Sequence, residues 1–176
     1  MKKKAGVDSL FRKKKNAVFV LTGTPGTGKT TVAKALAKKF EGTWLNELDF
    51  AMAKNLGKRS SDGEWEIPVE KLAKALSRDL EQRKKPLFLE GHVLCETKVP
   101  VDNVVVLECP PQVLEQRLTR RRYAPLKVLE NVWAEQNRYC LKKARQTFSR
   151  KVKKVSSDQT IRRTLQSVEK ALGLLK

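Results

Sequence analysis

Residues 16–40 place a short apolar run, a glycine-rich loop and an amphipathic segment directly one after another. The run NAVFVLTG is rich in β-branched residues and ends on glycine, which predicts a buried strand. The segment TTVAKALAKKF has apolar residues three and four apart, which predicts a helix. Between them, residues 23–30 read GTPGTGKT and match G-x-x-x-x-G-K-[ST] in full. Backbone N–H groups of such a loop and the following helix N-terminus bind phosphate, so the chain is predicted to bind a nucleotide.

Two residues of this loop have expected roles in phosphate chemistry. Lys29 is expected to reach the β and γ phosphates, and the hydroxyl of Thr30 to coordinate Mg²⁺. The sequence has no N-K-x-D-like loop to read guanine, which argues against a GTPase. At 176 residues it is also too short for a helicase-like or ring-forming ATPase core. A small kinase or a small ATPase using ATP and Mg²⁺ remains.

Strand and helix patterns alternate along the rest of the chain. Strands are expected at residues 43–47, 86–91, 103–108 and 151–156, and helices at 48–56, 68–83, 110–122, 125–148 and 156–175, with a polar loop at 57–66. Pro68 is expected in the first turn of its helix, and Ser157 or Asp158 as the cap of the last. The predicted fold is α/β, with a parallel sheet between two helical layers and its ligand site at the carboxyl ends of the strands.

One of these strand ends carries an unusual pair of polar residues. The stretch LFLEGHVL contains Glu90 and, two positions later, His92, the only histidine of the chain. Glu90 is expected to hold a Mg²⁺-bound water or to orient the attacking one, and His92 to polarise that water. The alternatives are a structural strand end and a loop histidine bonded to a backbone carbonyl. Glu108, at the next strand end, is interpreted as part of a structural turn.

Residues 117–127, RLTRRRYAPLK, join two predicted helices and carry five Arg or Lys. Phosphoryl transfer needs cations around the phosphate oxygens and exclusion of water, so we interpret this segment as a lid in which Arg121 reaches the nucleotide. A solvated helix end facing RNA is the alternative. Trp133 and Tyr139 have helical spacing and are expected to be packing residues.

Positive charge dominates the composition, with 38 Lys and Arg against 19 Asp and Glu, a formal charge of +19. Such an excess favours nucleic acid or a ribosomal partner, and the alternative is the Lys-rich surface of heat-adapted proteins. Residues 1–15 are expected to form a basic arm and residues 16–176 a single domain.

No apolar run approaches the roughly 20 residues of a membrane span. We therefore expect a cytoplasmic protein, or a nuclear one in a eukaryote, with no membrane partner. The three cysteines are expected to be small buried residues.

Several of these motifs together resemble the adenylate kinase 6 type, also called the CINAP family, of small adenylate-kinase-like ATPases. The resemblance runs from about residue 16 to the C-terminus and rests on GTPGTGKTT (23–31), LNELDFA (45–51), LEGH (89–92), RLTRRRY (117–123) and ENVWAE (130–135). The first motif is shared by many kinases. The acid-x-His, the short lid and the E-N-x-x-A-E segment are together more specific.

The resemblance implies a P-loop nucleoside monophosphate kinase fold with five parallel strands. It implies a segment at residues 46–69 that receives a nucleoside monophosphate, and a lid at residues 120–130. The residues implied to bind ATP are Gly26, Gly28, Lys29, Thr30, Thr31 and Arg121. Catalytic roles fall on Lys29, Glu90, His92 and Arg121, and metal binding on Thr30 and Glu90.

The family's activity is reversible phosphoryl transfer from ATP to AMP, together with ATP hydrolysis in small ribosomal subunit assembly and rRNA processing. The implied partners are AMP, a small-subunit ribosomal protein and pre-rRNA, for a monomer or a transient complex. The chain departs from the family's pattern at three positions. Arg122 stands where the lid usually has glycine, Glu90 where the strand end has aspartate, and Met52 where some relatives have arginine.

Three activities therefore stay open from the sequence. The first is a nucleoside monophosphate kinase, and the second is an assembly ATPase that hydrolyses ATP slowly. The third is a P-loop kinase of another small acceptor, of a shikimate-like or nucleoside kind, whose pocket residues 46–69 would form. A lid that excludes water incompletely would combine the first two.

Overall fold

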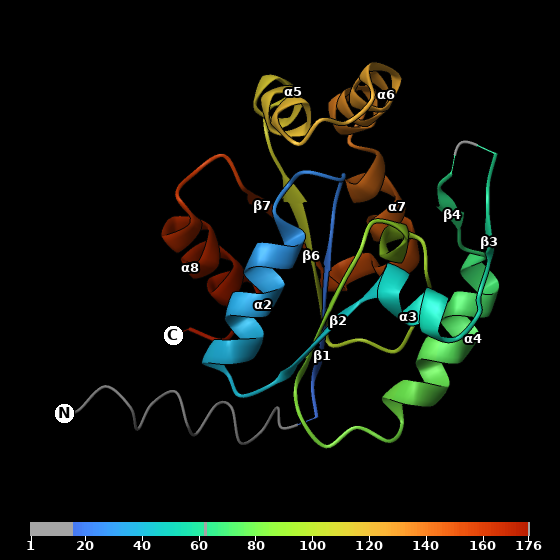
Figure 1. The fold of residues 1–176 in the computed structure, drawn as a ribbon. Coiled ribbons are helices and arrows are strands. Elements are labelled where there is room, and N and C mark those ends of the chain that lie inside the picture. The colour runs from blue at the N-terminus through green and yellow to red at the C-terminus, as the bar shows by residue number, and fades with distance from the viewer. Residues whose placement is uncertain (1–15, 62, 176) are drawn as a thin grey trace.

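The computed structural model describes residues 16–61 and 63–175, and its centre is one sheet of five strands (Figure 1). The strands are β1 (Val18–Thr22), β2 (Thr43–Asn46), β5 (Leu87–Glu90), β6 (Asn103–Glu108) and β7 (Val152–Ser156), in the spatial order β2-β5-β1-β6-β7. Every neighbouring pair is parallel. This confirms the predicted fold class. The predicted basic arm at residues 1–15 lies outside the described residues.

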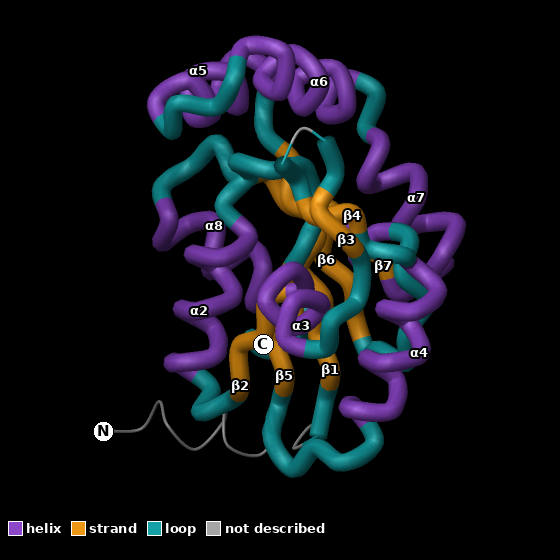
Figure 2. The backbone as a smooth tube through the Cα atoms, turned by 45° about the vertical axis from the view of Figure 1, so that its right-hand side comes forward, coloured by secondary structure: helices purple, strands orange, loops and turns teal. Residues whose placement is uncertain are grey.

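Helices cover both faces of the sheet. On one face lie α2 (Lys29–Lys39) and α8 (Ile161–Ala171), and on the other α3 (Glu47–Ala53), α4 (Val69–Leu80) and α7 (Tyr139–Phe148). The remaining two, α5 (Pro111–Arg120) and α6 (Pro125–Gln136), stand above the carboxyl edge of the sheet (Figures 1 and 2). Short 3₁₀ turns occur at Val93–Cys95 (η1) and Ser149–Lys151 (η2).

Apart from their ends, the central strands are apolar because both of their faces are covered. All five residues of β1 and all four of β5 are buried. The rings of Phe19 and Phe88 stack with centroids 5.3 Å apart beneath α2. Each such ring contributes roughly 1.5–3 kcal/mol by leaving water, so this packing fixes the strand ends that carry the polar residues.

The helix predicted over residues 125–148 is wrong, because the chain breaks it into α6 and α7. Arg138 stands at the break with a φ of 50°, a left-handed conformation. Val128 of α6 packs against α5, whereas Leu141 and Phe148 of α7 pack on the sheet. One straight helix cannot serve both surfaces, and their packing outweighs the roughly 1–2 kcal/mol that a left-handed residue costs.

Three further local predictions need correction. The expected loop at residues 57–66 contains a small antiparallel hairpin of β3 (Lys58–Arg59) and β4 (Trp65–Glu66). The indole N–H of Trp65 donates to the Leu56 carbonyl at 2.7 Å, which anchors the hairpin. The last helix is capped by the Thr160 hydroxyl, not by Ser157 or Asp158, and Pro68 is the N-cap of α4, one residue before its first turn.

Cys95, Cys109 and Cys140 are buried, as the sequence indicated, and their thiols are free. Among residues 16–61 and 63–175, no helix has the length and apolar character required to cross a bilayer.

Candidate nucleotide site

The glycine-rich loop connects β1 to α2 at the carboxyl edge of the sheet. Gly26 has a φ of 93°, and a Cβ there would lie 2.8 Å from a methyl of Leu114, so this position requires glycine. Gly28 has the same φ but faces open space, which leaves its backbone accessible to a ligand. The loop thus has the geometry that phosphate binding requires.

Lys29 folds back over the loop. Its Nζ donates to the carbonyls of Gly23 at 2.9 Å and Thr24 at 3.2 Å, and its side chain is buried. Burial lowers the pKa of this amine, and the nearby carboxylates Glu47 and Glu90 act in the opposite direction. A phosphate that entered the loop would take over these hydrogen bonds and supply the missing counter-charge.

Glu90, at the end of β5, forms a polar cluster with residues of β2 and α2. Its Oε1 accepts from the Thr30 hydroxyl at 2.9 Å and from the Asn46 amide at 2.6 Å. The side-chain oxygen of Asn46, Oδ1, in turn caps α3 by accepting from the backbone N–H groups of Leu48 and Asp49. Parallel pairing of β5 with β1 and β2 brings these side chains together.

A hydroxyl and a carboxylate are ligands of the kind that Mg²⁺ prefers, so Thr30 and Glu90 fit the predicted ion. The described residues hold no group of three or more His, Cys, Asp or Glu side chains arranged for a metal. A cation bound here would therefore take its other ligands from water and nucleotide phosphates, as Mg²⁺ in phosphoryl-transfer sites usually does.

His92 turns away from Glu90 towards the glycine-rich loop. Its Nδ1 lies 3.3 Å from the Gly23 carbonyl and 3.4 Å from the Cys140 thiol. Within the described residues no hydrogen bond joins His92 to Glu90, so the two side chains have different surroundings. A carbonyl only accepts, so the Gly23 contact places a proton on Nδ1 and leaves Nε2 for another group.

The thiol beside His92 has an unusual acidity. A hydrogen bond from Cys95 and the neighbouring His92 lower the pKa of Cys140 to about 5, although burial acts against this. Burial lowers the pKa of His92, but Cys140 and the Gly23 carbonyl outweigh it and hold the value above 6.5. The pair therefore favours a thiolate next to an imidazolium.

Glu47 is a buried carboxylate that the sequence analysis did not single out. Its oxygens accept from three successive backbone N–H groups, those of His92 at 2.5 Å and of Val93 and Leu94 at 2.9 Å. A Cβ on Gly91 would lie 2.0 Å from its carboxyl carbon, so Gly91 makes room for it. Burial raises the pKa of Glu47, while the N–H groups and Lys29 oppose this. Glu47 thereby fixes the loop that carries His92.

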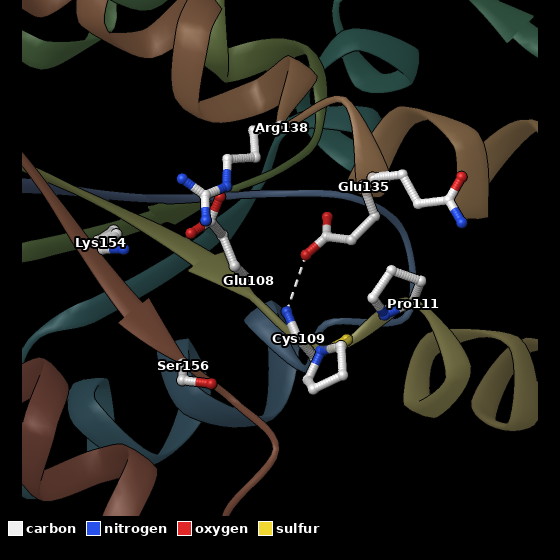
Figure 3. A pocket seen from close by; sticks show the side chains of 9 residues that line it. Glu108, Cys109, Pro111, Glu135, Arg138, Lys154 and Ser156 are labelled. Atoms are coloured by element: carbon white, nitrogen blue, oxygen red, sulfur yellow. Dashed lines mark hydrogen bonds between the residues drawn. The ribbon is translucent and has the colours of Figure 1, made fainter.

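Glu135, the last residue of the E-N-x-x-A-E motif, connects α6 to the glycine-rich loop. One carboxylate oxygen accepts from the Thr24 hydroxyl at 2.5 Å, and the other from the backbone N–H of Cys109 at 2.8 Å (Figure 3). Burial raises the pKa of this carboxyl group, and its two donors act against the shift. The motif was noted from the family resemblance, but the spacing of residues in the sequence does not predict that Glu135 bonds to Thr24 and Cys109.

A cavity of about 280 Å³ lies over the loop and is the candidate ATP pocket. Gly26, Gly28 and Thr31 line it from below, and it is also lined by Arg117 of α5 and by Arg121, the C-cap of that helix. Arg117 donates to the Ser157 carbonyl at 2.6 Å and so holds the loop between β7 and α8. The Arg121 side chain has no hydrogen bond or ion pair with any described residue, which leaves its guanidinium available to a phosphate.

A second cavity, of about 540 Å³, lies on the other side of His92. It is bounded by His92, Tyr139 and the α6 residues Leu129, Glu130 and Trp133. Trp133 is 65% exposed, so the expectation that it is a packing residue is wrong.

The cations of residues 46–69 are mostly engaged within that segment. Lys58 lies 4.0 Å from Glu66 across the hairpin, and Arg59 donates to the Gly63 carbonyl at 3.3 Å. Lys54 lies over the Phe50 ring, and Met52 is 45% exposed.

Comparison with known proteins places the chain among relatives. A family model described as "AAA domain" matches residues 20–138. The chain belongs to this family. A protein of Pyrococcus abyssi named "Putative adenylate kinase" is 42% identical over 118 residues, which is 67% of this chain and 63% of that protein. The chain thus aligns with somewhat less than two thirds of that relative's length.

Other relatives of this adenylate-kinase-like P-loop chain carry the same name. The protein of Methanocaldococcus jannaschii is 36% identical, with 70% of this chain and 69% of the relative covered. That of Methanosarcina acetivorans is 33% identical, with 88% and 86% covered.

Two solved structures share the fold of the adenylate-kinase-like chain. A shikimate kinase from Aquifex aeolicus has a TM-score of 0.59, with 89% of this chain and 96% of the other covered. A gluconokinase from Sinorhizobium meliloti has a TM-score of 0.58, with 90% and 92% covered. Both are 16% identical to this chain, so they support the fold alone.

Proposed function

We propose that the chain is a nucleotide kinase that transfers the γ-phosphoryl group of ATP to AMP and releases two ADP. The observation that carries this proposal is the cavity that joins Gly26 and Gly28 of the loop to Arg121 at the end of α5, next to the start of α2 at Lys29. A cation above the phosphates and backbone N–H groups below them form the electrostatic frame that phosphoryl transfer needs. The relatives' name favours AMP as the acceptor.

Each proposed site residue has a distinct task in this scheme. Lys29 leaves the Gly23 and Thr24 carbonyls to bind phosphate oxygens, and Arg121 neutralises charge that develops on the transferred group. Thr30 and Glu90 would hold Mg²⁺, which supplies charge neutralisation of the phosphates when bound. His92 offers Nε2 to the acceptor side, where it orients the attacking oxygen.

ATP hydrolysis follows as a second activity of the same site. The cavity beside His92 is open enough for water to take the acceptor's place when AMP is absent. We propose that this hydrolysis serves small ribosomal subunit assembly in the cytoplasm, with a ribosomal protein and pre-rRNA as partners. The charge of +19 and the family resemblance support this part of the proposal.

The test supplies purified protein with ATP and Mg²⁺, with and without AMP, and follows ADP, AMP and free phosphate. AMP should raise ADP formation, and Lys29→Met should lower both activities by about 10²–10³-fold, as loss of a group that stabilises the transition state does. His92→Ala should lower transfer and hydrolysis while ATP binding persists. ADP formation that ignores AMP would contradict the kinase proposal, and a His92→Ala protein with wild-type rates would contradict the role of His92.

A further inference from the structure

A basic groove runs along β7, the edge strand of the sheet. It has a volume of about 590 Å³ and carries four cations, Arg145 from α7, Lys153 and Lys154 from β7, and Lys170 from α8. All four side chains are exposed. None of them has an ion pair with a described residue, and no Asp or Glu lines this groove.

The pleat of β7 distributes these charges on both sides of the strand. Val152 packs against the α7 side and Val155 against the α8 side. Because side chains alternate along a strand, Lys154 lies on the side of Arg145, and Lys153 on the side of Lys170. An extended polyanion lying along the strand would therefore meet two cations on each side.

We propose that this groove binds the sugar-phosphate backbone of single-stranded nucleic acid. A five-residue strand spans about 16 Å, so several consecutive phosphates of one nucleic-acid strand can lie along it beside the four cations. No aromatic side chain lines the groove, so binding depends on phosphates and is tolerant of base sequence.

Two neighbouring features limit the site and its occupant. The cavity at the carboxyl end of β7 shares Lys154 and Ser156 with the groove and contains the carboxylates of Glu108 and Glu135 (Figure 3), and Asp158 accepts from the Ser156 hydroxyl at 2.7 Å. Acidic groups therefore bound the groove at that end. Adjacent lysines on an edge strand oppose pairing with another strand, so an added peptide strand is disfavoured.

The test measures binding of fluorescent 12-nucleotide oligouridine and oligothymidine to the full chain by anisotropy between 50 and 200 mM KCl. Lys153→Gln/Lys154→Gln should weaken binding at least about tenfold at 50 mM, and reduce the slope of log affinity against log salt by about 1.4, at about 0.7 per lost contact. The matched control is Lys84→Gln/Lys85→Gln, which removes two exposed lysines from the loop before β5, three strands away from β7. This control should leave the slope unchanged.

Equal losses in the two double variants would overturn the proposal, because binding would then follow net charge alone. Binding of an acidic octaglutamate peptide that depends on Lys153 and Lys154, without oligonucleotide binding, would also overturn it. The inference is independent of the kinase proposal. Phosphoryl transfer from ATP to AMP should stay at the wild-type rate in Lys153→Gln/Lys154→Gln, so failure of one proposal is distinguishable from failure of the other.

Discussion

Arg122 occupies a backbone conformation that suits glycine. Its φ is 58°, and it follows Arg121, the C-cap of α5, at the position where a left-handed residue commonly ends a helix. In the family that the sequence resembles, this position of the proposed lid is usually glycine. A left-handed conformation costs an ordinary residue roughly 1–2 kcal/mol, and glycine avoids this cost. Glycine also loses more chain entropy on folding, which offsets part of the gain.

We therefore expect Arg122→Gly to stabilise the protein by roughly 0.5–1 kcal/mol. Urea unfolding followed by circular dichroism measures this difference. Arg122→Ala is the matched control, because it removes the same charge and keeps the Cβ atom. Equal stabilisation by both variants would mean that charge, and not the backbone, sets the effect.

His92 is the only histidine, so one NMR signal reports its titration. Because its pKa is raised above 6.5, the imidazolium of the wild type should persist to a higher pH than that of a model peptide. Cys140→Ser removes the thiolate, which leaves burial to lower the pKa. We expect the midpoint to fall by about 1–3 pH units, the usual effect of a close opposite charge.

The titration is measured on the imidazole Hε1 resonance under reducing conditions. Cys109→Ser is the control, since Cys109 is a buried cysteine that belongs to the separate cluster under α5 and α6. Its midpoint should match the wild type. An unchanged midpoint in Cys140→Ser would show that the thiol is not charged at neutral pH.

At the scale of elements, most strands and helices follow from local patterns, whereas the break at Asn137–Arg138 does not. Apolar spacing continues across it, and only the positions of α5 and of the sheet decide that α6 and α7 diverge. The β3–β4 hairpin also cannot be predicted from apolar spacing, because its strands have two residues each and no buried face.

The candidate site shows the same division between local and tertiary information. Lys29, Thr30 and Glu90 follow from the loop motif and the strand end, and their side chains do gather at one edge. Glu47 contacts His92 across 45 positions of sequence, and Cys140 contacts it across 48. Such contacts depend on how α3, η1 and α7 meet in space, which no spacing along the chain encodes.

An ion pair connects α6 to the β3–β4 hairpin, beside the cavity proposed here for the acceptor. Lys127 Nζ lies 2.8 Å from Glu64 and 3.1 Å from Glu130, and these hydrogen bonds raise the pKa of Lys127. Because the pair is partly exposed, Glu64→Gln should cost only about 0.2–1 kcal/mol, which is roughly a 1.5- to 5-fold rise in KM for AMP. Steady-state kinetics at fixed ATP measure this change.

Glu66→Gln is the control for this variant. It makes the same change on the same hairpin, but Glu66 faces Lys58 rather than α6. The ratio of the two KM values isolates the contact between α6 and the hairpin. If both variants raise the KM for AMP equally, the effect comes from the net charge of the hairpin and not from the contact between Lys127 and Glu64.

The whole molecule has far more positive than negative charge. Outside residues 1–15 the chain still has 31 Lys and Arg against 18 Asp and Glu, and the basic groove, Arg117 and Arg121 concentrate part of this excess. The same charges that would attract phosphates repel one another in the folded state. Exposed ion pairs such as Lys127–Glu64 are too weak to offset this repulsion.

Salt should therefore stabilise this protein, in contrast to one held together by surface ion pairs. We expect the Tm to rise between 20 and 200 mM KCl and then to level off, because the Debye length falls to about 8 Å at 0.15 M and screening of separated charges is then nearly complete. Differential scanning fluorimetry at pH 7 measures the curve. A Tm that falls with salt would mean that attractive pairs dominate. A steady rise beyond 0.5 M would point to salt exclusion from apolar surface instead, because that effect does not saturate with the Debye length.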